Sequence, residues 1–232
     1  MQTNKPKLVV LSGAGISAES GLKTFRDADG LWEGHNVYEV ATPRGFASNP
    51  KLVLDFYNMR RRDVSKAMPN AAHIELANLE SDFDVTIITQ NIDDLHERGG
   101  SSNVLHLHGE IFKMRSVFDT ETIYEIRDDI NVGDKAPDGY QLRPHIVWFE
   151  EQVPMLEFAV PIIESADVFV IIGTSLQVYP AASLINFASK EIPKFIIDKK
   201  VPHTNGIQNI KAIESTASQG LLQLKEELNK LF

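Results

Sequence analysis

The segment from Lys7 to Gly21 constrains the fold more than any other part of the chain. An apolar run from Leu8 to Leu11 ends in Ser-Gly13-Ala-Gly15, and a helix-like segment follows. This order is typical of a strand that runs into a phosphate-binding turn, where glycines allow a tight turn and a helix N-terminus faces the anion. The spacing Gly13-x-Gly15-x-x-Ala18 is a weak signal when it is taken alone.

The sequence after this turn argues against hydride transfer. A dinucleotide-binding dehydrogenase would continue with a second buried strand and a ribose-binding acid roughly 20 residues on. The chain instead continues with Phe25-Arg26-Asp27, followed by Gly30 and Trp32, which is a polar, glycine-containing loop. We therefore expect a dinucleotide ligand but not a dehydrogenase.

The composition excludes several other classes of protein. There is no cysteine among the 232 residues, which rules out disulfides, thiol catalysis and thiolate zinc sites. The net charge of −9 argues against nucleic-acid partners, and apolar runs such as 168–172 are too short to cross a bilayer. No signal peptide is recognisable before the first strand, so we expect a cytoplasmic protein without membrane partners and, by default, a monomer.

Short apolar runs alternate with helix-like segments along the chain. We predict strands at 7–12, 84–89, 103–107, 145–149, 167–172, 194–198 and 210–214, and helices at 50–66, 70–80, 153–165, 180–190 and 218–231. This alternation predicts an α/β fold, a Rossmann-like parallel sheet with helices on both faces. Residues 25–66 and 111–143 break the alternation, and we expect these two insertions to form a small module. Residues 1–24, 67–110 and 144–232 would form the Rossmann-like, dinucleotide-binding domain.

Three polar clusters, 12–17, 89–94 and 173–175, follow predicted strands. Ligands of parallel sheets bind beyond the carboxyl ends of the strands, so these clusters are candidates for one site. The amides and carboxylate of 89–93 could bind ribose hydroxyls and a carboxamide, although Asn91 or Asp93 could equally be a helix N-cap. Gly173-Thr174-Ser175 suits ribose or phosphate contact. Asp198 could bind a ribose hydroxyl or merely cap a turn.

His106 and His108 alternate with leucines and therefore lie on one face of a strand. His108 stands at the strand end, where a histidine can act as a base near neutral pH. For His106 we favour a role as a hydrogen-bonded core or packing histidine. A metal site made of His96, His106 and His108 is conceivable, but no carboxylate lies at a helpful spacing.

Tyr57 and Arg60 are three residues apart on a predicted helix and therefore share a face. A phenol and a guanidinium on one face can bind a carboxylate, with the arginine bidentate. The alternative is a solvated basic helix end, which Arg61 and Arg62 fit better than Arg60 does.

Taken together, these motifs make the chain resemble a known family. Gly13-Ala-Gly-Ile-Ser17, Phe25-Arg26, Thr89-Gln-Asn-Ile-Asp93, His108-Gly109 and Gly173-Thr-Ser175 occur in the order and approximate spacing of the sirtuins, which are NAD-dependent protein lysine deacylases. The resemblance covers nearly the whole chain. It is closest to the bacterial CobB-like branch, on motifs such as Arg143-Pro-His-Ile-Val-Trp-Phe149.

The resemblance implies a role for each matched residue. His108 would be the catalytic base, and Asn91 and Asp93 would act beside it. The implied NAD-binding residues are Gly13, Ala14, Gly15, Ser17, Phe25, Arg26, Gln90, Asn91, Ile92, Asp93, Gly173, Thr174 and Ser175, with Asp198 and Ala217 aligning less securely. The substrate backbone would lie as a strand between 147–150 and 176–179, which places Val147, Phe149, Val178 and Tyr179 beside it.

The implied reaction consumes NAD and transfers the acyl group of an acyl-lysine protein or peptide. Its products would be nicotinamide, O-acyl-ADP-ribose and free lysine. Ala41, Tyr57 and Arg60 match the acyl pocket of sirtuins that remove succinyl and malonyl groups, so we expect activity on these acidic groups besides acetyl. A mono-ADP-ribosyltransferase and a non-catalytic sensor of NAD or O-acyl-ADP-ribose are the alternatives.

The chain departs from the sirtuin pattern in its small module, where most sirtuins hold a structural zinc with four cysteines. Ser116 stands where the first cysteine is expected, so we expect no zinc and no other metal. Apolar contacts from Ile123, Tyr124, Ile126 and Ile130 are our candidates for replacing it. Glu150 stands where related chains often have glycine.

Overall fold

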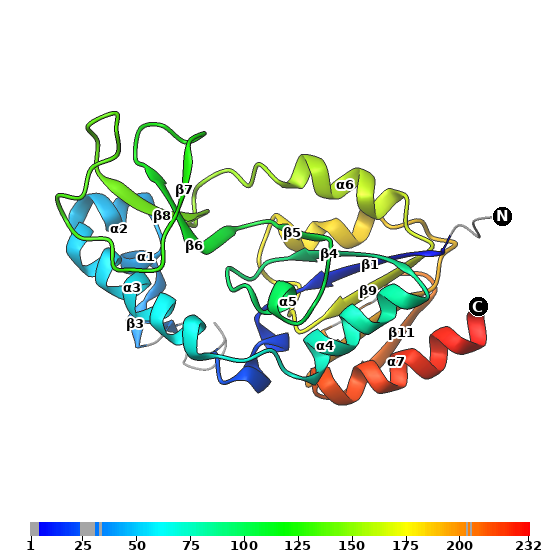
Figure 1. The fold of residues 1–232 in the computed structure, drawn as a ribbon. Helices are drawn as coiled ribbons and strands as arrows, with labels where there is room; N and C mark the ends of the chain where they lie inside the picture. The colour runs from blue at the N-terminus through cyan, green and yellow to red at the C-terminus, as the bar shows by residue number, and fades with distance from the viewer. Residues whose placement is uncertain (1–4, 24–30, 33, 203, 205) are drawn as a thin grey trace.

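The computed structural model describes residues 5–23, 31–32, 34–202, 204 and 206–232. Its main sheet has six parallel strands: β1 (Lys7–Ser12), β4 (Asp84–Thr89), β5 (Val104–His106), β9 (Val168–Ile172), β10 (Lys194–Asp198) and β11 (Ile210–Glu214). The strand order is β11-β10-β9-β1-β4-β5 (Figure 1). From β1 the chain first adds β4 and β5 on one side. It then places β9 on the other side of β1, followed by β10 and β11. This doubly wound order confirms the predicted Rossmann-like sheet.

Alternating side chains of each strand form two separate cores. Leu8 and Val10 pack on one face, beneath helices α4 (Ala71–Asn78) and α7 (Ala217–Leu231). Val9 and Leu11 pack on the other, beneath α6 (Leu156–Glu164) and the 3₁₀ helix η4 (Ala181–Phe187). Short helices η3 (Leu79–Ser81) and α5 (Leu95–Arg98) complete this part of the chain. In the part of the chain described, no helix has the length and apolar character needed to cross a membrane.

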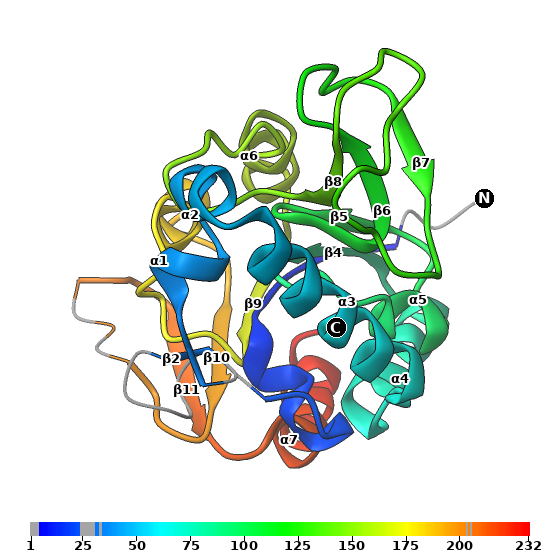
Figure 2. The same cartoon turned by 90° about the vertical axis from the view of Figure 1, so that its left-hand side faces the viewer.

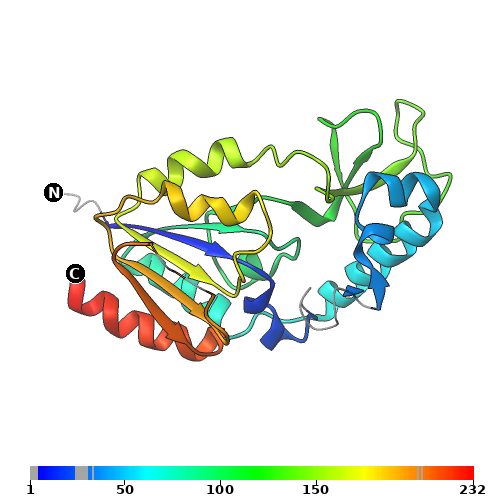
Figure 3. The ribbon, with the colours of Figure 1, turned by 180° about the vertical axis from the view of Figure 1, so that it is seen from behind.

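A second, smaller unit lies beyond the carboxyl ends of the main strands (Figure 1), and Figure 2 shows β6, β7 and β8 of this unit next to one another. It contains the antiparallel sheet β7-β6-β8, formed by β6 (Gly109–Ser116), β7 (Ile123–Glu125) and β8 (Leu142–Ile146), and the helices α1 (Val37–Val40), α2 (Pro43–Ser48) and α3 (Pro50–Lys66). The strands β2 (Leu31–Trp32) and β3 (His35–Asn36) form a short hairpin. One apolar cluster joins α3 to β6 and β8 through Val53, Tyr57, Ile111 and Ile146. Figure 3 shows the main strands pointing toward this unit.

Several predicted elements differ from the structure. The helix expected after Gly15 is absent, and two 3₁₀ turns, η1 (Ala14–Ile16) and η2 (Ala18–Ser20), stand in its place. The strand predicted at 145–149 is wrong, because only its first two residues are in a strand, β8, which pairs with β6 outside the main sheet. The helix predicted at 180–190 is a 3₁₀ helix. Strands β6 and β7 were not predicted.

Buried polar groups also connect α3 to the segment 111–130. Arg61 is 1% exposed; its Nε donates to the carbonyl oxygen of Ile111 at 2.9 Å and its Nη1 to that of Asp128 at 3.1 Å. Asn58 exchanges two hydrogen bonds with the backbone of Ile130. Of the four proposed apolar replacements for zinc, Ile130 is buried, but Ile123 is 45% exposed and does not fill a core. Assigning Arg61 to a solvated helix end was therefore wrong.

Candidate active site

A cavity of about 410 Å³ separates the carboxyl ends of the main strands from the small unit. Every site residue predicted from the sequence lines it, except Phe25 and Arg26, which lie outside the residues that the structure describes. The predicted residues along its wall are Gly13, Ala14, Gly15, Ser17, Ala41, Tyr57, Arg60, Gln90, Asn91, Ile92, Asp93, His108, Val147, Phe149, Gly173, Thr174, Ser175, Val178, Tyr179, Asp198 and Ala217. Residues from segments far apart in the sequence thus share one cavity.

The glycines at the ends of β1 and β9 let two turns approach each other closely. A Cβ on Gly15 would lie 2.7 Å from the Cα of Gly173, and Gly173 itself has a φ of +65°. The N–H groups of Gly13 and Gly15 donate to the carbonyl oxygens of Ile172 and Gly173. These two N–H groups therefore hold the two turns together. Glycine is needed at these positions because the turns after β1 and β9 approach each other so closely. The two strands flank the switch point of the sheet, where ligands of this fold bind.

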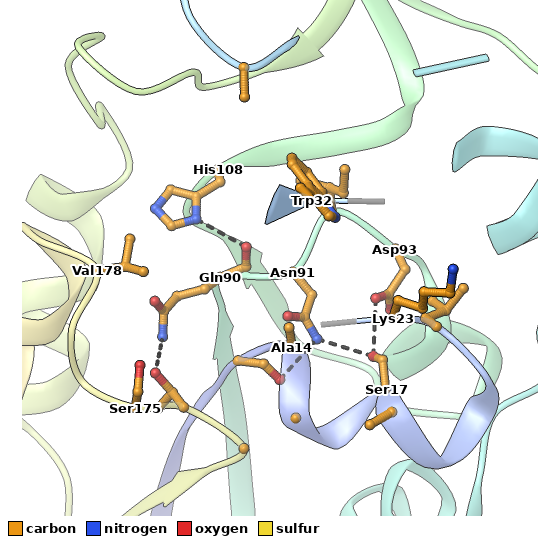
Figure 4. A pocket seen from close by; sticks show the side chains of 18 of the residues that line it. Ala14, Ser17, Lys23, Trp32, Gln90, Asn91, Asp93, His108, Ser175 and Val178 are labelled. Carbon is orange, nitrogen blue, oxygen red and sulfur yellow. Dashed lines mark hydrogen bonds between the residues drawn. The ribbon is translucent and has the colours of Figure 1, made fainter. Parts of the chain in front are cut away.

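The turn after β4 is held rigidly by hydrogen bonds. The backbone N–H of Asn91 donates to Thr89 Oγ1 at 3.0 Å, and its side-chain amide donates to Gly13 O and Ser17 Oγ (Figure 4). Ser17 Oγ in turn donates to Asp93 Oδ2 at 3.0 Å. Neither Asn91 nor Asp93 caps a long helix, although Asp93 Oδ1 does accept from Leu95 N. Burial raises the pKa of the Asp93 carboxyl, and these hydrogen bonds oppose the shift.

His108 is oriented to act as a base. Its Nδ1 lies 3.0 Å from the carbonyl oxygen of Gln90 (Figure 4). Because a carbonyl oxygen can only accept, Nδ1 carries the proton and Nε2 keeps its lone pair. Burial lowers the pKa of His108, so the ring is neutral at neutral pH. The side chain of Gln90 extends away from this contact and donates to Thr174 Oγ1 at 3.1 Å.

The three histidines considered as a metal site do not converge. His96 Nε2 is 2.8 Å from Ser12 Oγ, and both ring nitrogens of His106 contact protein acceptors. Within the described ranges, no group of three or more histidine, aspartate or glutamate side chains is arranged to hold a metal ion.

One end of the cavity lies between β10 and α7. Asp198, at the end of β10, accepts from Lys200 N at 3.0 Å, and Ala217 is the first residue of α7. The sequence interpretation missed Lys199, Lys200 and Ser215, which also line this end. The position of Lys199 and Lys200 directly after a strand end was a signal that could have identified them.

The opposite end of the cavity is formed by α3 and by the segment that follows β8. Tyr57 and Arg60 are both buried on α3, and Ala41 lies beside them with 3% exposure. The Tyr57 hydroxyl and the Trp148 indole N–H are buried without a partner of good hydrogen-bond geometry in the described part of the chain. Burial raises the pKa of Tyr57, so the phenol stays protonated and able to donate. Trp148 was missed, although it lies between Val147 and Phe149 in the sequence.

Two segments border the mouth of the cavity. In the first segment, 147–150, Val147 N donates to His108 O at 2.9 Å and Phe149 N donates to Ala41 O at 3.0 Å. The segment is therefore fixed to the end of the main sheet through His108 and to the small unit through Ala41. The second segment is 176–179, in which Tyr179 is 74% exposed. Glu150 also lines the mouth, has a φ of +74° and forms an ion pair with Arg44. That φ favours glycine, which agrees with the residue that related chains often carry there.

These features define a class: a doubly wound α/β protein whose switch-point cavity suits a dinucleotide and extends to a second pocket in a small inserted unit. The residues present fit NAD, because closely packed glycine turns, buried amides and a carboxylate meet at that switch point. The sequence profile of the Sir2 family matches residues 13–180. The chain belongs to the Sir2 family.

Similar proteins cover almost the whole chain. An NAD-dependent protein deacylase of Helicobacter pylori strain 26695 is 54% identical over 95% of this chain and 96% of its own length. A solved Sir2 homolog–NAD complex is 36% identical, with a TM-score of 0.86 over 98% of this chain and 91% of that one. A Sir2–p53 peptide–NAD⁺ structure is 30% identical, with a TM-score of 0.80 over 97% and 94%.

Proposed function

We propose that the protein is an NAD-dependent protein lysine deacylase that removes acetyl, succinyl and malonyl groups. The products would be nicotinamide, O-acyl-ADP-ribose and free lysine. The similar protein of Helicobacter pylori is named as an NAD-dependent protein deacylase, and family membership extends over most of the chain. A cytoplasmic location, a monomeric state and the lack of nucleic-acid partners stay predictions from composition.

The observation that carries this proposal is the orientation of His108 in the cavity. Its Nδ1–H is fixed by Gln90 O, which leaves Nε2 as the only ring atom that can accept a proton. Its lowered pKa keeps that nitrogen unprotonated at neutral pH. NAD, when bound, supplies a ribose carbon with nicotinamide as the leaving group. His108 would then take the proton of a ribose hydroxyl.

Other side chains of this chain would orient the cofactor and exclude water. Asn91 and Asp93 present an amide and a carboxylate that their hydrogen bonds hold in one position, suited to ribose hydroxyls and a carboxamide. Fixed polar groups of this kind cost little reorganisation when the reaction occurs. Gly173 to Ser175, Asp198 and Ala217 would border the adenosine half.

The pocket on α3 supports the activity on acidic acyl groups. Arg60 and the buried Tyr57 hydroxyl are hydrogen-bond donors beside the small Ala41, which leaves depth in the pocket. A terminal carboxylate would give the tyrosine a partner and the arginine a charge-assisted contact. An acetyl group would reach neither.

The peptide would lie between the two segments at the mouth, where Val147, Phe149, Val178 and Tyr179 are exposed to it. The solved Sir2 relative with a p53 peptide supports a peptide substrate. Extended peptides bind such edges through main-chain hydrogen bonds.

Mass spectrometry of matched acetyl-lysine and succinyl-lysine peptides, incubated with the protein and NAD, tests the proposal. Wild-type protein should convert both peptides to the form with a free lysine and should produce O-acyl-ADP-ribose. His108→Asn keeps a donor for Gln90 O but removes the base, and the rate should fall by about 10²- to 10⁴-fold. Calorimetry should show that the variant still binds NAD. If no acyl group is lost while NAD binds, then ADP-ribosyl transfer or sensing replaces the proposal.

A further inference from the structure

His106 and His108 make the same contact to consecutive residues of the turn after β4. His106 Nδ1 lies 3.1 Å from the carbonyl oxygen of Asn91, and His108 Nδ1 lies 3.0 Å from that of Gln90. This repetition follows from the parallel pairing of β4 with β5, which sets Thr89 opposite His106. β5 ends at His106, and His108 lies in the turn before β6, so the prediction that both histidines lie on one strand is wrong, although both rings reach the turn after β4.

The two rings differ in what their second nitrogen faces. His108 Nε2 has no protein acceptor among its described contacts, whereas His106 Nε2 lies 2.7 Å from Glu97 Oε1. A carbonyl oxygen and a carboxylate are both acceptors, so the ring of His106 must donate from both nitrogens. Only the imidazolium form does so. The two contacts together therefore favour an imidazolium at His106, paired with an ionised Glu97.

The charges around His106 agree with that form. Burial alone would lower the pKa of His106, but the hydrogen bond and charge of Glu97, together with the charge of Glu110, raise it above its ordinary value. Glu97 shows the complementary shift: burial would raise its pKa, and His106 lowers it. The other titratable groups near the pair are His96 on α5, Lys113 on β6, and Asp93 and Asp94 in the turn.

The imidazolium acts on the part of the turn that carries Asn91 and Asp93, two of the residues that line the cavity. It fixes Asn91 from behind, while the side-chain amide of Asn91 is held in front by Gly13 and Ser17. Its charge also opposes the effect of burial on the pKa of Asp93, a carboxyl that Ser17 Oγ and Leu95 N hold by hydrogen bonds.

We propose that His106 is a positioning residue: the imidazolium, held between Asn91 O and Glu97, keeps Asn91 in place for binding the nicotinamide ribose of NAD. This inference rests on the proposed function and assigns to His106 a role beyond packing. The sequence interpretation, a hydrogen-bonded core or packing histidine, agrees with the two contacts of His106, and the proposal adds a role toward NAD.

The proposal gives the two histidines opposite pH effects. The folded protein favours the charged form of His106, so its contribution is complete at low pH and is lost as the pH rises through its raised pKa. NAD affinity should therefore decrease toward alkaline pH. His108 must be neutral to act, so turnover should decrease as the pH falls through its lowered pKa.

Glu97→Gln tests the charge while it preserves the shape. Glutamine can donate to His106 Nε2, which leaves a neutral ring whose Nδ1 still bonds Asn91 O. Nitrogen-15 NMR of the imidazole rings, assigned with His106→Gln, should show His106 doubly protonated at pH 7 in the wild type. In Glu97→Gln its titration midpoint should move to lower pH. The Kd for NAD at pH 7, measured by calorimetry, should rise about tenfold.

Glu80→Gln is the matched control, because Glu80 also binds the loop before β5, through Ser102, but lies outside the cavity. It should change neither the NMR midpoint nor the Kd. A neutral His106 in the wild type, or an unchanged NAD affinity in Glu97→Gln, would overturn the proposal. These readouts do not require turnover. A protein that binds NAD as expected but removes no acyl group would leave the role of His106 intact and contradict only the proposed function.

Discussion

Ile171 on β9 and Arg61 on α3 are both almost completely buried, but they stabilise their surroundings in different ways. Ile171 belongs to an apolar core in which the strands of the main sheet pack against α6 and η4. Arg61 donates to backbone carbonyls at the centre of the small unit, next to an aromatic and aliphatic cluster. Apolar packing is non-directional, whereas the contacts of Arg61 depend on exact geometry.

The difference explains how the small unit can be ordered without thiolate ligands. Where most sirtuins are expected to hold zinc with cysteines, this chain has Ser116, which is buried and accepts from Phe118 N. Nearby, Arg143 lies over the Trp148 ring at 3.3 Å and forms two hydrogen bonds with Glu151. Arg61 thus connects α3 to β6, and Arg143 connects β8 to Trp148 and Glu151, which line the cavity.

The largest expected effect on stability belongs to the main sheet. Ile171→Ala should lower the free energy of unfolding by about 2–5 kcal/mol, because it removes buried methyl groups and leaves a cavity. Denaturant unfolding followed by circular dichroism would measure it. Hydrogen exchange should become faster throughout the chain, since the main core unfolds globally. Faster hydrogen exchange confined to the small unit would contradict the assignment of Ile171 to the core that stabilises the whole protein.

A smaller and more local effect is expected from Arg61→Met. The pKa of Arg61 is lowered by burial to about 10, so the side chain is still charged at pH 7. Methionine removes the cost of burying that charge, but leaves two carbonyl groups without their donor. The free energy of unfolding should fall by about 2–4 kcal/mol.

Hydrogen exchange should locate the effect of Arg61→Met. Amides of 109–146 should exchange faster, while those of β1, β9 and β10 should change little. Arg62→Met is the matched control, since Arg62 is exposed and forms only a surface ion pair with Asp129. Equal effects of the two variants would show that the buried arginine does not stabilise the unit.

The same contrast explains what could be predicted from the sequence. Most strands of the main sheet are short, continuous apolar runs that are easily recognised, and the predicted helix 50–66 agrees with α3 at both ends. β6 and β7 are not apolar runs of this kind, because they pair within a small sheet with polar and half-exposed residues. The order of motifs along the chain was sufficient to bring most site residues together. The partners of Arg61 and of His106 depend on contacts between distant segments, which one sequence does not reveal.

The smallest effect is expected from metal removal. Because the chain has no cysteine, a thiolate zinc site cannot form, and dialysis against a chelator should change neither the melting temperature nor the rate of acyl removal. A lower melting temperature that added zinc restores would show that other side chains bind a structural metal.

The most direct test of the account compares Arg60→Met with wild-type protein on succinyl-lysine and acetyl-lysine forms of one peptide. The account predicts that kcat/KM for the succinyl peptide falls about a hundredfold, because the charge-assisted contact to the carboxylate is lost. The value for the acetyl peptide should stay within about threefold of wild type, and Arg62→Met should leave both values unchanged. An equal loss on both peptides would contradict the assignment of Arg60 and Tyr57 to the acidic acyl group.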